Sequence, residues 1–299
     1  MTETAAPTTA TATTATGTTA GATAADPAPA PAPAPFDLFA LHVLRAERLT
    51  PSMVRVVFGG PGMPRMASAG RDQRIKLFLP SAGQQAPHLP DSADDEWYAA
   101  WQALDPATRG IMRTYTIREL DAPAGELTVD FAAHGDEGPA SRWALRARPG
   151  DRVGVFAPVV EENLAFEFRP PADTDWILLT ADPSALPAIA NILAHLPRSV
   201  PVRAWIEVPT PEDRQALPTH ADADITWLTA SGTTPEAIRA ATLPEGTPYA
   251  FVVGESSSVK SVRRHLVTER GFDRKRVKFS GYWRQGTSED ALAQSGEAA

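Results

Sequence analysis

The chain has 299 residues, of which 43% are hydrophobic, and a net charge of −8. A folded chain of this length buries about three-quarters of its unfolded surface, which is enough for two hydrophobic cores. The sequence has no cysteine, which excludes disulfides, thiolate zinc sites, cysteine nucleophiles and cysteine-held iron–sulfur clusters. The negative charge does not favour nucleic acid as a partner.

The first 35 residues differ in composition from the rest. They include 13 Ala, 11 Thr and 6 Pro and end in alternating Pro and Ala. Because such a segment has no large side chains to bury, it cannot offset its ordering entropy. We therefore expect residues 1–35 to form a disordered tail. The tail lacks the basic start and apolar run of a secretory signal, and no stretch of the chain approaches the ~20 apolar residues of a membrane span. We therefore expect a cytoplasmic protein.

Residues 36–168 are predicted to form a domain of short β-strands. Apolar patterns predict strands at Val54–Phe58, Ile75–Leu79, Met112–Arg118, Leu127–Phe131 and Arg152–Phe156. One helix is predicted at Pro139–Arg148, and a loop or short helix with embedded aromatic residues at Asp91–Ala107. Proline and glycine between the strands favour an antiparallel β-barrel.

Strands and helices alternate over residues 175–286, after a proline-containing linker. Strands are predicted at Trp176–Ala181, Val202–Val208, Asp224–Thr229, Tyr249–Gly254 and Val277–Trp283, and helices at Leu186–Leu196, Pro235–Ala241 and Ser257–Arg270. This order predicts a parallel sheet with helices on its faces. Ligands of such sheets bind beyond the carboxyl ends of the strands, so we expect the site in a cleft between the two domains. Residues 287–299 are expected to be a flexible C-terminus.

The segment Arg113–Arg118 carries groups suited to a phosphate and a flat ring. The twofold repeat of a strand places Arg113 and Tyr115 on one face. There a guanidinium can hold a phosphate, while the phenol ring lies against a heterocycle. An ordinary barrel strand with a surface arginine explains this segment equally well.

A second segment, His134–Trp143, opens the predicted helix of the first domain. Gly138 lets a ligand approach the backbone, and the following proline suits the first helical position. The free N–H groups of Ala140 and Ser141 would then face an anion. A capped helix without a ligand is the alternative. Two such segments in one small domain nevertheless predict a pyrophosphate site.

Five segments of the chain together form a recognisable pattern. In chain order they are Arg113–Arg118, His134–Trp143, Ala181–Ile189, Gly254-Glu255 and Ser280–Gly286. With these segments the chain resembles the siderophore-interacting protein family, which comprises FAD-dependent ferric-siderophore reductases within the ferredoxin-reductase-like superfamily. The resemblance spans about 36 to 286. It implies an antiparallel FAD-binding β-barrel, of the FR type, followed by a parallel-sheet domain that binds NAD(P)H.

The resemblance also implies which residues contact FAD. Arg113 would contact the phosphates, Tyr115 would pack on the isoalloxazine, and Thr116 would hydrogen-bond near the flavin N5. Trp283 would lie against the flavin, although a tryptophan on the last strand is equally typical of a core. The pyrophosphate and adenosine side would be held by His134, Gly138, Ala140 and Ser141.

The NAD(P)H and substrate sites are implied in the same way. The turn after the first strand of the second domain and the end of its fourth strand would border the nicotinamide pocket, through Asp182, Pro187, Gly254 and Glu255. Lys76 and Lys278 resemble basic substrate-contact positions of the family.

The C-terminal part of the second domain is strongly basic. Between Lys260 and Arg284 the sequence has nine Lys and Arg against two acidic residues, which would attract an anionic ferric complex. Arg263, Arg264 and Arg270 lie beside the apolar stripe of a predicted helix, so we expect them to face solvent.

The resemblance implies a two-stage reaction without a protein-bound metal. NAD(P)H would reduce FAD, and electrons would then pass to the Fe³⁺ of a ferric siderophore, which is released inside the cell as Fe²⁺. Two alternatives stay open. One is a flavin oxidoreductase with another acceptor, such as free flavin or a quinone. The other is a flavin-bearing siderophore binder that is reduced by a ferredoxin-like partner.

Overall fold

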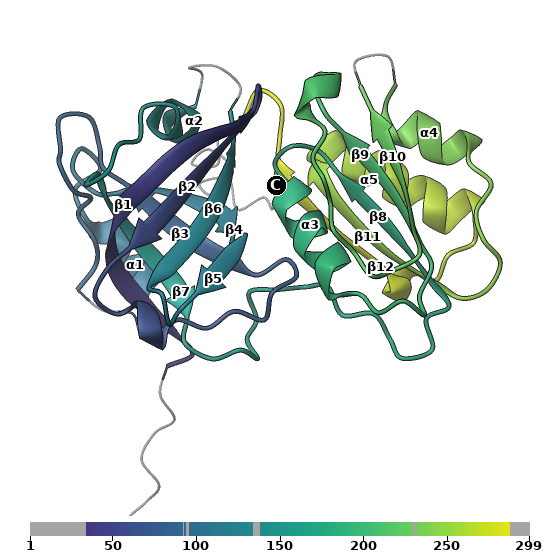
Figure 1. The fold of residues 1–299 in the computed structure, drawn as a ribbon, viewed down its shortest axis with the longest axis horizontal. Helices are drawn as coiled ribbons and strands as arrows, with labels where there is room; N and C mark the ends of the chain where they lie inside the picture. The colour runs from purple at the N-terminus through teal and green to yellow at the C-terminus, as the bar shows by residue number, and fades with distance from the viewer. Residues whose placement is uncertain (1–33, 92, 94–95, 134–137, 230–231, 288–299) are drawn as a thin grey trace, which may run out of the picture. The chain divides into compact units, whose positions relative to one another are not determined.

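The structure, a computed structural model, describes residues 34–91, 93, 96–133, 138–229 and 232–287 (Figure 1). The predicted tail lies outside these residues except for Ala34 and Pro35, and all but one residue of the predicted C-terminus, Thr287, lies outside them too. The described chain contains two sheets, one antiparallel and one parallel.

The antiparallel sheet has seven strands in the order β4-β3-β7-β1-β2-β6-β5. They are β1 (Phe36–Thr50), β2 (Met53–Gly59), β3 (Arg74–Leu79), β4 (Ile111–Thr116), β5 (Glu119–Asp121), β6 (Glu126–Ala132) and β7 (Arg152–Pro158). The sheet curls until β4 meets β6, where the rings of Tyr115 and Phe131 lie 4.4 Å apart. No ladder of hydrogen bonds joins these two strands among the described pairs, so the predicted barrel is an open, curled sheet.

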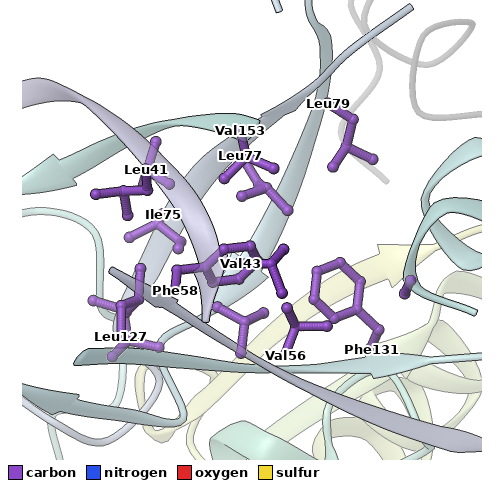
Figure 2. Close-up of a cluster of buried hydrophobic side chains, with 14 of the residues drawn as sticks. Leu41, Val43, Val56, Phe58, Ile75, Leu77, Leu79, Leu127, Phe131 and Val153 are labelled. Atoms are coloured by element: carbon purple, nitrogen blue, oxygen red, sulfur yellow. The ribbon is translucent and has the colours of Figure 1, made fainter. Parts of the chain in front are cut away.

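Alternation along the strands produces a core on each face of this sheet. Inside the curl, side chains such as Phe58, Leu77 and Phe131 are fully buried (Figure 2). On the opposite face, Phe78 packs under Trp101 of α1 (Trp97–Ala103). The aromatic segment expected there as a loop or short helix therefore contains a helix.

The second sheet has five parallel strands in the order β10-β9-β8-β11-β12. They are β8 (Trp176–Ala181), β9 (Val202–Glu207), β10 (Ala223–Leu228), β11 (Pro248–Glu255) and β12 (Val277–Trp283). Helix α3 (Leu186–His195) packs on one face of this sheet, while α4 (Thr234–Ala240) and α5 (Ser256–Arg264) pack on the other (Figure 1). This alternation confirms the predicted parallel sheet.

Two predicted helices are shorter than expected. Helix α2 spans Pro139–Ala144 rather than extending to Arg148, because Pro149 disfavours helical backbone before it and the last N–H groups close tighter turns. The last helix ends at Arg264 and continues as a π-helical turn, His265–Glu269. The N–H of Arg270 bonds five residues back, to the carbonyl of His265, at 3.1 Å.

One of the three arginines expected to face solvent is packed instead. Arg263 is half-buried, and its guanidinium lies 4.3 Å from the centre of the Phe279 ring. Arg264 and Arg270 are exposed, as predicted. Arg270 also donates to backbone carbonyls at the end of α4, including that of Arg239 at 2.9 Å.

Candidate active site

A pocket of about 770 Å³ is lined by residues of both sheets. In the first domain, the lining includes residues of the edge strand β4, of its neighbour β3 and of the start of α2. In the second domain, it includes residues of the turn before α3 and of the end of β12. This is the carboxyl end of the parallel strands, where the sequence predicts the ligand site.

The start of α2 and Arg113 lie at this pocket. Arg113 is half-buried and donates from Nη1 to the carbonyl of Met112 at 2.7 Å. Gly138, the residue before α2, has extended backbone and places no side chain on the N–H groups of the first turn. Ala140 and Ser141 are buried and line the pocket. The four residues predicted to hold phosphate thus share one pocket, while His134 lies outside the described residues.

An aromatic wall stands beside these groups. The Tyr115 ring lines the pocket and is backed by Phe131 on β6, which in turn packs against Trp143 of α2. Thr116 is buried at the end of β4 and also lines the pocket. Tyr115 is therefore a supported flat surface next to the predicted phosphate end.

The wall from the parallel sheet contains two aromatic residues at the end of β12. Trp283 keeps 38% of its surface exposed, and Pro187 at the first turn of α3 lies in the same lining. The hydroxyl of Tyr282 is buried without a hydrogen-bond partner in the described chain. Burial raises the pKa of Tyr282 well above its ordinary value, so the phenol keeps its proton even where an exposed tyrosine would ionise.

Three residues predicted for the nicotinamide pocket lie behind this wall rather than in its lining. Asp182 is buried and accepts the indole N–H of Trp283 at 2.6 Å. Gly254 lies next to that carboxylate, at the position of β11 after which the pairing with β12 shifts in register. Glu255 caps α5 through the N–H groups of Ser257 and Ser258. Against its burial, the hydrogen bond from the Ser257 hydroxyl and those from backbone N–H groups hold the pKa of Glu255 below its ordinary value.

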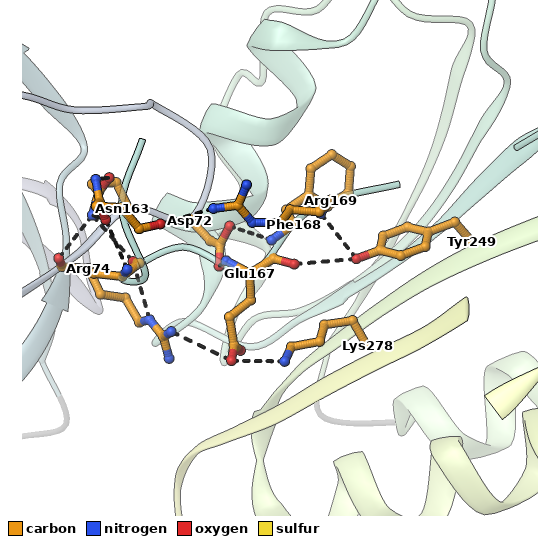
Figure 3. A network of polar contacts seen from close by, with 10 residues as sticks. Asp72, Arg74, Asn163, Glu167, Phe168, Arg169, Tyr249 and Lys278 are labelled. Atoms are coloured by element: carbon orange, nitrogen blue, oxygen red, sulfur yellow. Dashed lines mark hydrogen bonds and ion pairs between the residues drawn. The ribbon is translucent and has the colours of Figure 1, made fainter. Parts of the chain in front are cut away.

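The two predicted substrate lysines have different surroundings. Lys76 on β3 lines the pocket and donates to the Thr114 hydroxyl at 2.7 Å. Lys278 is outside the lining and pairs with Glu167 at 2.9 Å. Figure 3 shows that Glu167 also faces Arg74 of β3, 3.7 Å away, so this carboxylate joins both sheets.

Sequence reasoning missed several residues that line the pocket. Asp130 on β6 is buried there and is held by Arg55 through two hydrogen bonds of 2.7 and 2.8 Å. Phe36 and Trp97 both line the pocket and stack on the Phe156 ring. The sequence predicts the strand that carries Phe156, but it does not show that Phe156 stacks on residues 59 and 120 positions earlier in the chain.

Residues 42–162 match the family model for the siderophore-interacting FAD-binding domain, and residues 174–286 match the model for siderophore-interacting proteins. The chain belongs to the siderophore-interacting protein family. Among the described residues, none of the helices has both the length and the apolar character that a membrane span requires.

Relatives of the chain include proteins of stated function. A siderophore utilization protein from T. fusca has a solved structure that is 35% identical, with a TM-score of 0.74 over 85% of this chain and 95% of that one. Ferric vibriobactin reductase ViuB of Vibrio cholerae is 29% identical over 84% of this chain and 91% of its own. The NADPH-dependent ferric-chelate reductase of Escherichia coli is 29% identical over 81% and 91%.

A more distant structure confirms the predicted fold class. A ferredoxin NADP+ reductase from Neisseria gonorrhoeae is 15% identical, with a TM-score of 0.57 over 84% of this chain and all of that one, and it shares the fold. The siderophore-interacting protein described here therefore combines a curled antiparallel FAD-binding domain with a parallel α/β domain.

The residues of the pocket fit FAD. Its volume lies in the range of cofactor sites, which is about 300–1,000 Å³. The guanidinium of Arg113 and the first turn of α2, whose N-cap residue Gly138 has no side chain, suit a pyrophosphate, and the Tyr115 ring suits the flavin. Apart from its chain neighbours, no described residue has a heavy atom within 4 Å of the position that a Cβ would take at Gly138, so these residues leave space for a ligand against the backbone.

Proposed function

We propose that this protein is an FAD-dependent reductase of ferric siderophores that works in the cytoplasm with NAD(P)H as its electron donor. The observation that carries the proposal is the shared pocket, in which the predicted FAD residues of β4 and α2 face Pro187 and Trp283 of the parallel domain. The names of the relatives from Vibrio cholerae and Escherichia coli, which are reductases of ferric chelates, support it.

The chain's own residues would bind and orient the reactants. Arg113 and the first N–H groups of α2 would neutralise the pyrophosphate, which fixes the cofactor along the pocket. Tyr115 and Trp283 would confine flat rings between the two domains and exclude water from them. FAD, when bound, accepts a hydride from NAD(P)H and gives up its two electrons singly, so one hydride reduces two Fe³⁺ to two Fe²⁺.

The ferric complex would be attracted by Lys76 and Lys278. Lys76 is in the lining, so its ammonium group would contact an anionic complex in the pocket. Lys278 would act through the field near the pocket, because Glu167 already neutralises part of its charge. Fe²⁺ binds the hard oxygen donors of siderophores less tightly than Fe³⁺, so reduction would loosen the metal for release.

Anaerobic stopped-flow mixing tests the proposal. The FAD-loaded protein is mixed with NADPH or NADH, and the visible absorption of the flavin is followed. It is then mixed with catecholate, hydroxycarboxylate and hydroxamate ferric siderophores. We expect bleaching by at least one nicotinamide and recovery of the absorption with a ferric siderophore.

Two results would contradict the proposal in different ways. Bleaching that no ferric siderophore reverses would point to another acceptor, such as free flavin or a quinone. Absence of bleaching by both nicotinamides would point to a different donor, such as a ferredoxin-like protein.

A further inference from the structure

Two side chains, those of Asp182 and Ser256, bond Trp283, and Glu255 bonds the backbone two residues further on; we call these three side chains the Trp283 mount. The indole Nε1–H donates to Oδ2 of Asp182 at 2.6 Å, and the hydroxyl of Ser256 donates to the carbonyl of Trp283 at 3.0 Å. The N–H of Gln285 donates to Oε1 of Glu255 at 3.3 Å. The indole and the backbone around it therefore have fixed partners, while over a third of the residue stays exposed at the pocket.

Asp182 is built to face the indole. Its Oδ1 accepts the N–H groups of Ser184 at 2.8 Å and Ala185 at 3.3 Å, so the turn before α3 fixes one carboxylate oxygen. The other oxygen, Oδ2, takes Trp283. Asp182 is 7% exposed, and a charge-assisted hydrogen bond in a buried place is stronger than one in water.

Gly254 keeps the space that this carboxylate needs. A Cβ at position 254 would lie 2.9 Å from Oδ2 of Asp182, and the residue has a φ of +134°, which favours glycine. Of the four residues that the resemblance linked to the nicotinamide, Asp182 thus bonds Trp283, Gly254 leaves room for Asp182, and Glu255 holds the backbone that follows Trp283.

We propose that Asp182 is a positioning residue that fixes the Trp283 indole as a platform for the flat nicotinamide ring of the reductant. This inference rests on the proposed function. Ser184 and Pro187, on the turn that Asp182 organises, line the same side of the pocket. Aromatic rings stack best at a defined offset, and a ring that is already held loses less freedom when a ligand binds.

The indole signals in a ¹H–¹⁵N spectrum of the FAD-loaded protein test the contact itself. The chain has seven tryptophans, and Trp283→Phe identifies the signal of Trp283 by its loss. In Asp182→Asn, the amide oxygen can keep the N–H groups of the turn, but its NH₂ then faces the indole N–H. We expect the Trp283 signal to move toward that of an exposed indole. Asp175→Asn is the matched control, because Asp175 accepts a backbone N–H, from Thr247, elsewhere in the same domain.

The dissociation constant of NADPH, obtained from the concentration dependence of flavin bleaching, tests the platform role. Asp182→Asn and Trp283→Phe should each raise it about tenfold, because the ring is no longer held in the first variant and is smaller and unbonded in the second. If Asp182 acts through the indole, the double variant should be no worse than the poorer single variant. FAD affinity should stay unchanged in Asp182→Asn.

Each other outcome overturns a defined part of the inference. An unmoved Trp283 signal in Asp182→Asn would refute the mount. Multiplying effects in the double variant would show that Asp182 acts independently of Trp283. If neither NADPH nor NADH reduces the wild-type flavin, the proposed function and the platform role both fail, and the indole signal still decides whether Asp182 holds Trp283.

Discussion

Arg113 is the residue that tests the phosphate end of the pocket. Replacing it with alanine removes the guanidinium while β4 keeps its ladder with β3. We expect FAD binding to weaken by about 1.5–3 kcal/mol, the usual contribution of a charge-assisted hydrogen bond. Titration of the apoprotein with FAD measures the change. A variant that holds FAD as tightly as the wild type would exclude contact between Arg113 and the phosphates.

Lys76 and Lys278 test how the ferric complex is attracted. Each alanine variant should raise the apparent KM for anionic ferric siderophores, with Lys76 having the larger effect because it lines the pocket. The effects should shrink as salt rises, since exposed charges are screened over ~8–10 Å. Steady-state assays with an anionic and a neutral complex provide the comparison.

Arg264→Ala is the control for the lysine variants, because Arg264 is exposed on α5 and is absent from the pocket lining. If Arg264→Ala raises KM more than Lys76→Ala, the substrate role of Lys76 is wrong.

Local sequence patterns predicted single residues of the candidate site better than contacts between residues that are distant in the sequence. Arg113 and Tyr115 were found because strand periodicity places both on one side, and the structure puts both at the pocket. The bond between Asp182 and Trp283 joins residues 101 positions apart. The residues around Asp182 and those around Trp283 do not show that the two side chains meet. The sequence therefore placed Asp182 only in the turn before α3.

Gly254, near the end of β11, and Gly138, before α2, should respond differently to the same substitution. Gly254→Ala should destabilise the fold by about 1–3 kcal/mol, because φ is +134° and the new methyl meets the Asp182 carboxylate. Gly138→Ala should leave stability nearly unchanged, because its backbone is extended and the position is open. The second change should instead weaken FAD binding.

Urea unfolding of the two apoproteins and FAD titration separate these effects. Equal stability of Gly254→Ala and wild type would mean that the Asp182 carboxylate moves without cost.

The bounds of some elements could be predicted from local apolar patterns. The strands β8 and β12 agree with their predicted ranges, and the stripe of Val259, Val262 and Leu266 on the last helix is buried. The end of the last helix was predicted less well, because it depends on partners distant in sequence. The π-helical turn that ends at Glu269 is tied through Arg270 to the carbonyls of α4.

The two sheets are joined by the segment 163–169, which follows β7 (Figure 3). Asp72, before β3, accepts the N–H groups of Glu167 and Phe168 at 2.8 and 2.9 Å. The hydroxyl of Tyr249 on β11 accepts the N–H of Arg169 at 3.2 Å. Burial raises the pKa of Asp72 above its ordinary range and raises that of Tyr249 to about 12.

Because of Tyr249, the free energy of unfolding should depend on pH in the alkaline range. Between pH 10 and 12 the folded protein keeps the phenolic proton that the unfolded chain has lost, so the free energy of unfolding falls as pH rises. The slope from this group should be at most about 1.4 kcal/mol per pH unit. Urea unfolding across this range should show a shallower fall in Tyr249→Phe. An identical pH profile in the variant would mean that Tyr249 ionises in the folded state as it does in the unfolded chain.

The central claim is that the whole molecule carries electrons from a nicotinamide through FAD to a siderophore-bound iron. Its most direct measurement is the Fe²⁺ formed in a single turnover. The FAD-loaded protein is reduced anaerobically with one equivalent of NADPH, or of NADH, and mixed with excess ferric siderophore and a ferrous-specific chelator. Because one hydride carries two electrons, we predict that two Fe²⁺ are trapped for each bound FAD. Reduced flavin that yields no Fe²⁺ with any siderophore class would contradict the account.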